Sequence, residues 1–320
     1  MNDTKKIERN FFQNTYTVKR SIGRWVFKFF RFAFILGLSY QFLFPVFYMV
    51  VTTFQNPSVV DPSVIWIPKN WSSEGIRGAI ENLKFFDSLF LTAVISLFST
   101  IASMISCSMV GYGFARFQFK GKSLVFALVV LTIIVPPQAL TMSSFLNYWY
   151  FDFGGILSLF GASVNLLNTP WVFIAPAMLA SGLRGGLFIF IFRQFFAQQP
   201  KELEEASKID GCGPFRTFVR VMIPMAAPAF VTVLLFSLVW HWNDIYSASV
   251  YFTDEVKPLS VMLYYLKDSL EASGLITANV TAGRMYMMAG VLLAISPLII
   301  LYLFTQKFFT ESIERTGIVG

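Results

Sequence analysis

The segment KELEEASKIDG, residues 201–211, carries six charged side chains within its first ten residues, in a chain that is otherwise strongly apolar. The 320 residues are 55% hydrophobic and 18% aromatic, only 13% are charged, and the mean hydropathy is +0.61. This composition is typical of an integral membrane protein. The charged segment therefore marks a place where the chain leaves the membrane, and the spans can be counted outward from it.

Long apolar runs lie on both sides of this segment. A helix needs about 20 apolar residues to cross roughly 30 Å of hydrocarbon. Six runs reach this length, near residues 29–54, 88–114, 123–149, 170–195, 225–250 and 284–308. The sequence therefore predicts an all-α integral membrane protein with six transmembrane helices, organised as a basic N-terminal tail at 1–28 and a transmembrane domain at 29–320.

The basic residues set the orientation. Most of the 25 Lys and Arg lie in the tail, in the second-to-third and fourth-to-fifth connections, and near the C-terminus. Because cytoplasmic loops retain positive charge, both termini and the charged segment are predicted to face the cytoplasm. The same excess accounts for the net charge of +7 without nucleic acid. The basic and aromatic tail is expected to lie along anionic membrane lipids.

The charged segment has the start and stop signals of a short helix. Pro200 suits a first helical turn, and Gly211 suits a left-handed stop. Glu204 and Lys208 lie four residues apart in the favourable order for a pair on an exposed face. A further proline after the turn can open a second helix, so residues 200–224 are predicted to form a cytoplasmic hairpin. A solvated loop that only connects two spans is the alternative.

The hairpin also carries a specific spacing of residues, which is Glu205, Ala206, Ser207, Gly211 and, after nine more residues, Val-Met-Ile-Pro at 221–224. This spacing resembles the EAA motif of the permease subunits of ABC importers, with Ser in place of its last Ala and Val in place of its Ile. Residues 111–126 and 165–196, and WND at 242–244, resemble the carbohydrate branch of that family. The likeness covers roughly residues 30–320.

The resemblance implies a type I ABC importer permease core formed by helices 2–6, with one extra N-terminal span, in the bacterial cytoplasmic membrane. In that family the EAA hairpin fits a cleft of a separate ATPase subunit. The docking residues implied here are Glu204, Glu205, Ala206, Ser207, Asp210 and Gly211. The partners implied are a pair of ATPase subunits, a second homologous permease and an extracytoplasmic solute-binding protein, and the implied activity is sugar import.

The chain itself is not expected to bind ATP or any other cofactor. The string GKS at 121–123 lacks the earlier glycine of a phosphate-binding loop, and a membrane helix precedes it rather than a strand. Arg116, Lys120 and Lys122 are instead expected to anchor this loop at the inner leaflet. An enzyme is also not expected, because one histidine cannot form an H-E-x-x-H zinc pair and no G-x-S-x-G elbow occurs.

A few polar side chains at membrane depth are candidates for lining a translocation path: Gln138, Arg184, Trp240, His241, Asn243 and Asp244. Such residues usually face a cavity or a partner. Trp240 and Asn243 suit sugar rings and hydroxyls. His241 and Asp244, three residues apart, support an alternative function, a proton-coupled secondary transporter. The simpler interpretation of this pair is hydrogen bonding that holds helix geometry.

Two further patterns carry structural expectations. Pro136 and Pro137 must break the third span, and Pro45, Pro176 and Pro297 are expected to interrupt spans one, four and six. Between spans five and six, one helical stripe of apolar residues predicts an amphipathic helix on the external face, which rests on the membrane or meets a solute-binding protein. Its members are Leu259, Met262, Leu263, Leu266 and Leu270.

Overall fold

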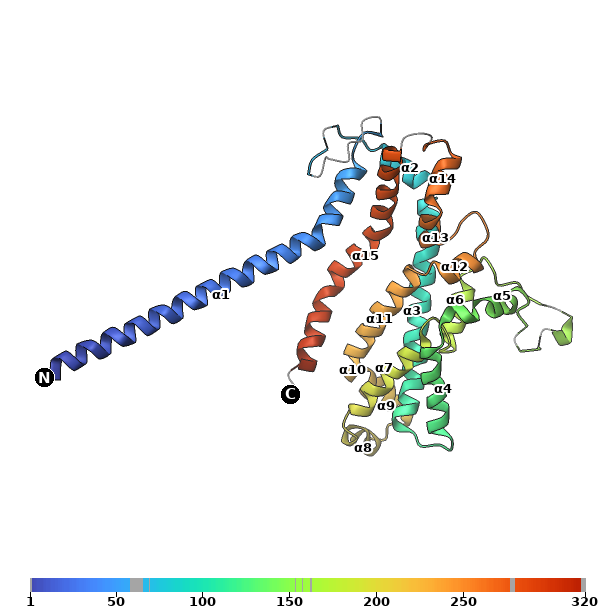
Figure 1. Ribbon diagram of the computed structural model, residues 1–320. Coiled ribbons are helices and arrows are strands. Elements are labelled where there is room, and N and C mark those ends of the chain that lie inside the picture. Colours follow the sequence, from blue (N-terminus) through green and yellow to red (C-terminus); the bar gives the residue numbers. More distant parts are fainter. Residues whose placement is uncertain are drawn as a thin grey trace.

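The computed structural model is all-helical (Figure 1) and describes residues 2–57, 66–68, 70–152, 154–156, 158–161, 163–276 and 280–317. Only the backbone is described for residues 2–24, 160, 280–281 and 307–317. Most basic side chains of the predicted tail therefore lie outside the described residues. Extended pairing within the described part of the chain is limited to two isolated bridges.

The helices before the charged segment are α1 (Asn2–Thr53), α2 (Glu74–Asn82), α3 (Phe85–Arg116), α4 (Lys122–Ile134), η2 (Pro137–Leu140), α5 (Thr141–Trp149), η3 (Ser158–Phe160), α6 (Trp171–Met178) and α7 (Gly185–Gln198). Those that follow are α8 (Glu202–Ile209), α9 (Pro214–Thr217), the π-helical turn η4 (Phe218–Met222), α10 (Ile223–Met225), α11 (Ala227–Trp242), α12 (Tyr246–Tyr251), α13 (Leu259–Tyr264), α14 (Leu266–Ala272) and α15 (Val280–Gly317).

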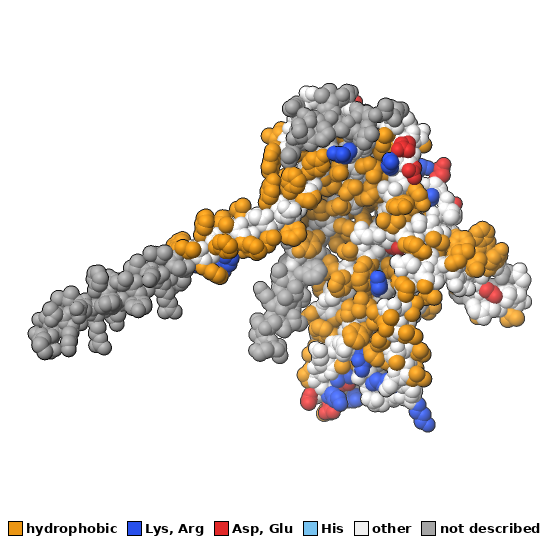
Figure 2. All heavy atoms as spheres, viewed as in Figure 1, with side chains coloured by type: hydrophobic (Ala, Val, Ile, Leu, Met, Phe, Trp, Pro, Cys, Tyr) orange, Lys and Arg blue, Asp and Glu red, His pale blue; other side chains and the backbone are white. Residues whose placement is uncertain are grey.

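The long helices run between two ends of the molecule (Figure 1). One end, here called the hairpin end, carries α8 and α9, and α15 runs toward it, whereas α1 projects away from the body to one side. The opposite end carries α2 and α14. On the face shown in Figure 2, the coloured surface between the two ends is covered mainly by apolar side chains, whereas most of the charged side chains lie toward the ends. This distribution is the one a membrane-embedded protein requires.

Three helical stretches are long and apolar enough to cross a membrane without a break, and these are Trp25–Thr53, Phe85–Arg116 and Ala282–Gln306. Two further candidates are bent pairs, α4 with η2–α5 at 99° and α9–α10 with α11 at 79°. The described residues thus contain three to five candidate spans by length and composition, against the six predicted. The predicted span at 170–195 is not one helix, because α6 and α7 are separated by a loop at 179–184.

The prolines explain some of these breaks. After α4 the chain turns extended at Val135 and Pro136, as predicted for a residue before proline and for a ring without an N–H group. α6 ends two residues after Pro176. The predicted interruptions at Pro45 and Pro297 are wrong, since α1 and α15 continue through them. A membrane helix tolerates a proline where its surroundings or local adjustments satisfy the freed backbone groups.

α3 is the helix around which the others pack, with α7, α11 and α6 against it. Its buried face is rich in serine and threonine, whose small side chains allow neighbouring helices to approach closely. Thr100 Oγ1 donates to Ser237 Oγ of α11 at 2.9 Å, and Thr92 Oγ1 accepts from the Leu259 N–H at the start of α13 at 2.7 Å. α3 is therefore joined to its neighbours by buried hydrogen bonds as well as by packing.

The predicted external amphipathic helix is present as two short helices, α13 and α14, which meet at Tyr265. Leu259, Leu266 and Leu270 of its stripe are fully buried. They belong to a cluster that includes Leu83 before α3 and Met285 of α15. The stripe therefore packs on the protein itself rather than resting on the membrane.

Candidate functional site

The charged segment folds as a helical hairpin at one end of the molecule. α8 ends in a left-handed turn at Gly211, whose φ is +78°, and the Cys212 N–H donates to the Ser207 carbonyl at 2.9 Å. This bond satisfies a carbonyl that the end of the helix leaves free. Pro214 then opens α9. The predicted helix, glycine stop and second helix all appear in the structure.

A buried hydroxyl pair joins the two arms of the hairpin. Ser207 Oγ and Thr217 Oγ1 lie 2.7 Å apart, and both residues are buried. Ser207 occupies the position at which the sequence departs from the last Ala of the EAA motif. Its hydroxyl makes a hydrogen bond that alanine cannot make, so the departure is matched by Thr217 ten residues later.

A buried ion pair joins the hairpin to α3. Arg116 Nε, at the C-terminal end of α3, lies 3.1 Å from Glu204 Oε1, and the two side chains are only 5% and 13% exposed. A second nitrogen of Arg116 donates to the Gln199 carbonyl at 2.7 Å. The prediction that Arg116 anchors the loop at the lipid surface is therefore wrong. The expected exposed pairing of Glu204 with Lys208 is also wrong, because the Glu204 carboxylate turns inward.

The six predicted docking residues divide into two faces. Glu205, Ala206, Asp210 and Gly211 are exposed at the hairpin end, whereas Ser207 and Glu204 face inward. Two apolar side chains that the sequence analysis did not select add to the exposed face. Ile209 is 86% exposed and Phe215 is 70% exposed. The exposed face of the hairpin therefore presents both acidic and apolar side chains.

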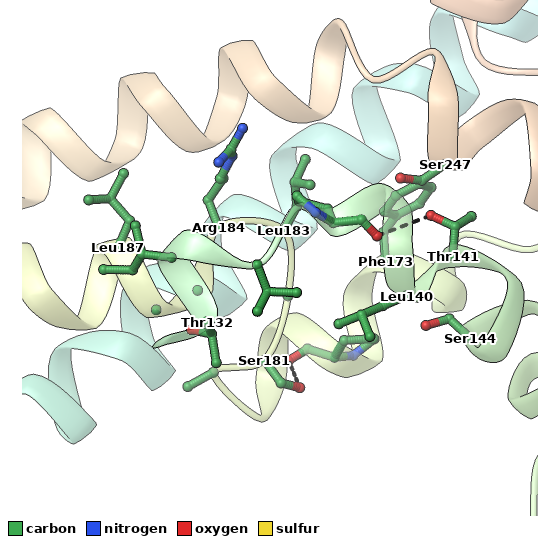
Figure 3. A pocket seen from close by; sticks show the side chains of 18 of the residues that line it. Thr132, Leu140, Thr141, Ser144, Phe173, Ser181, Leu183, Arg184, Leu187 and Ser247 are labelled. Carbon is green, nitrogen blue, oxygen red and sulfur yellow. Dashed lines mark hydrogen bonds between the residues drawn. The ribbon is translucent and has the colours of Figure 1, made fainter. Parts of the chain in front are cut away.

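A cavity of about 400 Å³ lies farther along the molecule, between the bent pair α4–η2–α5 and the loop that joins α6 to α7 (Figure 3). Its lining is mostly apolar, with hydroxyl groups from several elements, including Thr132, Thr141, Ser144, Ser181 and Ser247. This chemistry suits a ligand with both apolar faces and hydroxyls. The cavity exists because the two breaks, after α4 and after α6, prevent straight helices from packing along their whole length.

The predicted path residues lie in different places relative to this cavity. Arg184 lines it, and its guanidinium carbon lies 5.5 Å from the centre of the Trp240 ring. Gln138 is exposed in η2, between Pro137 and Leu140 near the cavity lining. The structure therefore brings Arg184 and Trp240 together, although 56 positions separate them in the chain.

The lining of the cavity does not include Trp240, His241, Asn243 or Asp244. His241 Nδ1 donates to the Ser237 carbonyl at 2.8 Å, on its own helix, and Asn243 caps α11 by donating to the Val239 carbonyl. Asp244 Oδ1 accepts from the Ser247 N–H at 3.1 Å, which caps the start of α12. Among the described residues His241 and Asp244 thus bond to backbone groups of their own segments, and no hydrogen bond joins the two.

The fold and these two features define a helical membrane protein with a charged helical hairpin at one end and a cavity among broken helices. Residues 107–315 match the family described as binding-protein-dependent transport system inner membrane component, and the chain belongs to that family. It is a permease subunit of an ABC transporter in the inner membrane, and ATP is bound by a partner ATPase subunit rather than by this chain.

Relatives with assigned cargo are similar over most of the chain. The Bacillus subtilis arabinooligosaccharides transport system permease protein AraQ is 28% identical over 90% of this chain and 94% of its own. The Bacillus subtilis polygalacturonan/rhamnogalacturonan permease protein YtcP is 26% identical over 90% and 96%. A crystal structure of a bacterial ABC transporter that imports the acidic polysaccharide alginate shares the fold, with a TM-score of 0.71, 22% identity, and coverage of 89% and 96%.

Proposed function

We propose that this permease carries oligosaccharides inward across the membrane, driven by ATP hydrolysis in its partner ATPase. The similar proteins support a carbohydrate cargo, because their assigned cargoes are arabinooligosaccharides, polygalacturonan or rhamnogalacturonan, and alginate. The cavity supports the same class, since its lining combines apolar walls with scattered hydroxyl groups.

The hairpin is the observation that carries the coupling mechanism. Residues 200–224 dock in a cleft of the ATPase through the exposed face formed by Glu205, Ala206, Asp210 and Gly211. The buried pair between Arg116 and Glu204 joins this docking element to the end of α3. Because α3 packs against α6, α7 and α11, a displacement of α8 moves the helices that surround the cavity. Closure of the ATPase pair would in this way switch the cavity between its two openings.

The proposed topology has six crossings with both termini cytoplasmic, and the helices from α3 onward form the type I core. The long helix α15 supports it, since it runs from the end of the molecule that carries α2 and α14 toward the end that carries α8 (Figure 1). In this arrangement α6 and α7 together make one crossing despite the loop between them. A second homologous permease completes the pathway, two ATPase subunits bind the hairpins, and an extracytoplasmic binding protein delivers the sugar.

A charge reversal and a backbone substitution on the hairpin test the docking. In Glu205→Lys and Gly211→Pro the chain is expected to insert normally but to lose the ATPase on purification in mild detergent, together with uptake of oligosaccharide. The control is Glu271→Lys, which reverses a half-exposed carboxylate at the opposite end of the molecule and should retain the ATPase. Retention of ATPase and of coupled uptake in both hairpin variants would contradict docking through this face.

A further inference from the structure

Arg184 is a cation far from either charged end of the protein. α7 contains 14 residues between Arg184 and the segment that leads into the hairpin, which at 1.5 Å per residue is about 21 Å. A bilayer core is about 30 Å thick, so this guanidinium lies well inside it. A charge at such a depth costs roughly 2.5–3.5 kcal/mol on insertion scales unless it faces a cavity or a partner. Arg184 is exposed and lines the cavity.

The backbone that carries Arg184 is held rigidly. Its φ of +61° is a left-handed conformation that non-glycine residues rarely adopt, and such strain is concentrated at functional sites. The next turn is packed directly on α4, since a Cβ at Gly186 would lie 2.9 Å from the Val129 carbonyl oxygen and would collide with the Thr132 hydroxyl. The Ser181 N–H also donates to the Pro176 carbonyl across the loop at 2.9 Å. The backbone from which the Arg184 side chain extends is therefore held in one conformation.

Among the described residues, the guanidinium has an aromatic neighbour but no acidic one. Trp240 lies 5.5 Å from it, and Trp240 is itself stacked between Phe188 and Phe236, at 5.7 and 5.3 Å. Within the described residues, no carboxylate lies within ion-pair distance of Arg184, and no other Lys, Arg, Asp or Glu lines the cavity. A guanidinium near a ring keeps N–H donors that can bind a planar anion in bidentate fashion. Figure 3 shows the Arg184 side chain extending from the loop between α6 and α7.

We propose that Arg184 binds the carboxylate of an acidic sugar, so that this permease selects oligosaccharides that contain uronic acid over neutral ones of the same length. The carboxylate binds the guanidinium, and hydroxyl groups of the cavity lining meet the sugar hydroxyls. The proposal rests on the proposed function, because it identifies the cargo of the same cavity. The similar proteins do not decide between acidic and neutral cargo, since their assigned cargoes include both arabinooligosaccharides and acidic polysaccharides.

The test compares two trisaccharides with the same linkages that differ in carboxylates, α-1,4-trigalacturonate and α-1,4-galactotriose. Binding of each radiolabelled trimer is measured by equilibrium dialysis on the complex purified with its partner subunits, without added binding protein. We expect the acidic trimer to bind at least tenfold more tightly, and the ratio to fall as salt rises. Arg184→Gln should raise the dissociation constant of the acidic trimer to that of the neutral one. Arg184→Lys should retain part of the preference, because an ammonium keeps the charge but not the bidentate geometry.

Arg77→Gln is the matched control, since it removes an exposed arginine of α2 and should keep the wild-type ratio. Equal binding of the two trimers to the wild type, an unchanged preference in Arg184→Gln, or binding of neither trimer would overturn the proposal. The salt dependence in the wild type gives a second readout if Arg184→Gln fails to assemble. Co-purification of an ATPase and a second permease distinguishes failure of this proposal from failure of the proposed function. If these partners are present and the complex does not select between the trimers, only the role of Arg184 is refuted. If the partners are absent, the proposed function itself fails.

Discussion

Breaking the buried pair between Arg116 and Glu204 should loosen the hairpin much more than breaking a surface pair. Glu204→Gln keeps the shape of the side chain and removes its charge, so the Arg116 guanidinium is left buried with one remaining bond, to the Gln199 carbonyl. The side chains are only 5% and 13% exposed, and solvent therefore cannot replace the lost partner. Removal of one member of a buried ion pair typically costs about 3–5 kcal/mol.

The lower end of that range applies here, because the bond from Arg116 to Gln199 remains. A loss of about 3 kcal/mol corresponds to roughly a hundredfold increase in the open population of the hairpin. Hydrogen exchange of the backbone amides in α8, measured by mass spectrometry on the purified complex, reports this opening directly. We expect exchange in α8 to accelerate by about two orders of magnitude while α13 and α14 are unchanged.

The control is Glu271→Gln, which removes the partner of Lys267 in a pair that is 3.7 Å apart with side chains 67% and 50% exposed. An exposed pair of this kind is worth at most a few tenths of a kcal/mol, so exchange in α14 should change less than threefold. The double variant Arg116→Met with Glu204→Leu should recover most of the protection, because apolar replacement of both partners is often neutral. If Glu204→Gln accelerates hydrogen exchange in α8 no more than Glu271→Gln accelerates it in α14, the pair between Arg116 and Glu204 does not hold the hairpin. The coupling argument then fails.

Three smaller predictions follow from local geometry. Gly211→Ala should lower the stability of the hairpin by about 1 kcal/mol in a thermal melt. The cost comes from backbone strain alone, because φ at Gly211 is +78° and an added Cβ would meet no atom within 4 Å. The control is Gly213→Ala, which has equal space but a φ of −71° and should be nearly neutral in the same melt. Gly186→Ala should lower the melting temperature of the complex, because the new methyl collides with α4 at a cost of about 1–3 kcal/mol. Lys84 lies 2.6 Å from Glu255 and lowers the pKa of that carboxyl. The contribution of this pair is therefore present above the ordinary carboxyl pKa and is lost as the pH falls through the lowered value, and Glu255→Gln should flatten that acidic limb of a stability profile.

The sequence predicts the hairpin well because its signals are local. The two prolines, the glycine stop and the cluster of charges each act within a few residues, so the helices and the turn at Gly211 appear as expected. The partners of the hairpin are not local. Arg116 lies 88 positions before Glu204, and no periodicity in either segment indicates that the two will be buried together. An arginine at a helix end suits a lipid anchor equally well until α3 and α8 are placed in space.

For the candidate path residues too, the sequence identifies unusual side chains but does not identify their partners. Composition singles out Arg184 and Trp240 as unusual at membrane depth, and only the packing of α7 against α11 brings them within 5.5 Å. Composition also singles out His241 and Asp244, and here the structure directs both side chains to backbone groups of their own segments. The spacing of two residues along a helix predicts that they lie close together, but it does not predict which group each polar side chain will bond to.

By itself the sequence determined that this is a helical membrane protein with a charged hairpin, because every span must be long and apolar enough to cross the hydrocarbon, while the charged residues collect in the connections. The tertiary structure alone decided that the span predicted at 170–195 breaks into α6 and α7, that the break leaves a cavity, and that Arg184 faces it. The physical reason is that a break in a helix is stable only where neighbouring elements fill the space and satisfy the freed backbone groups, and those neighbours come from distant parts of the chain.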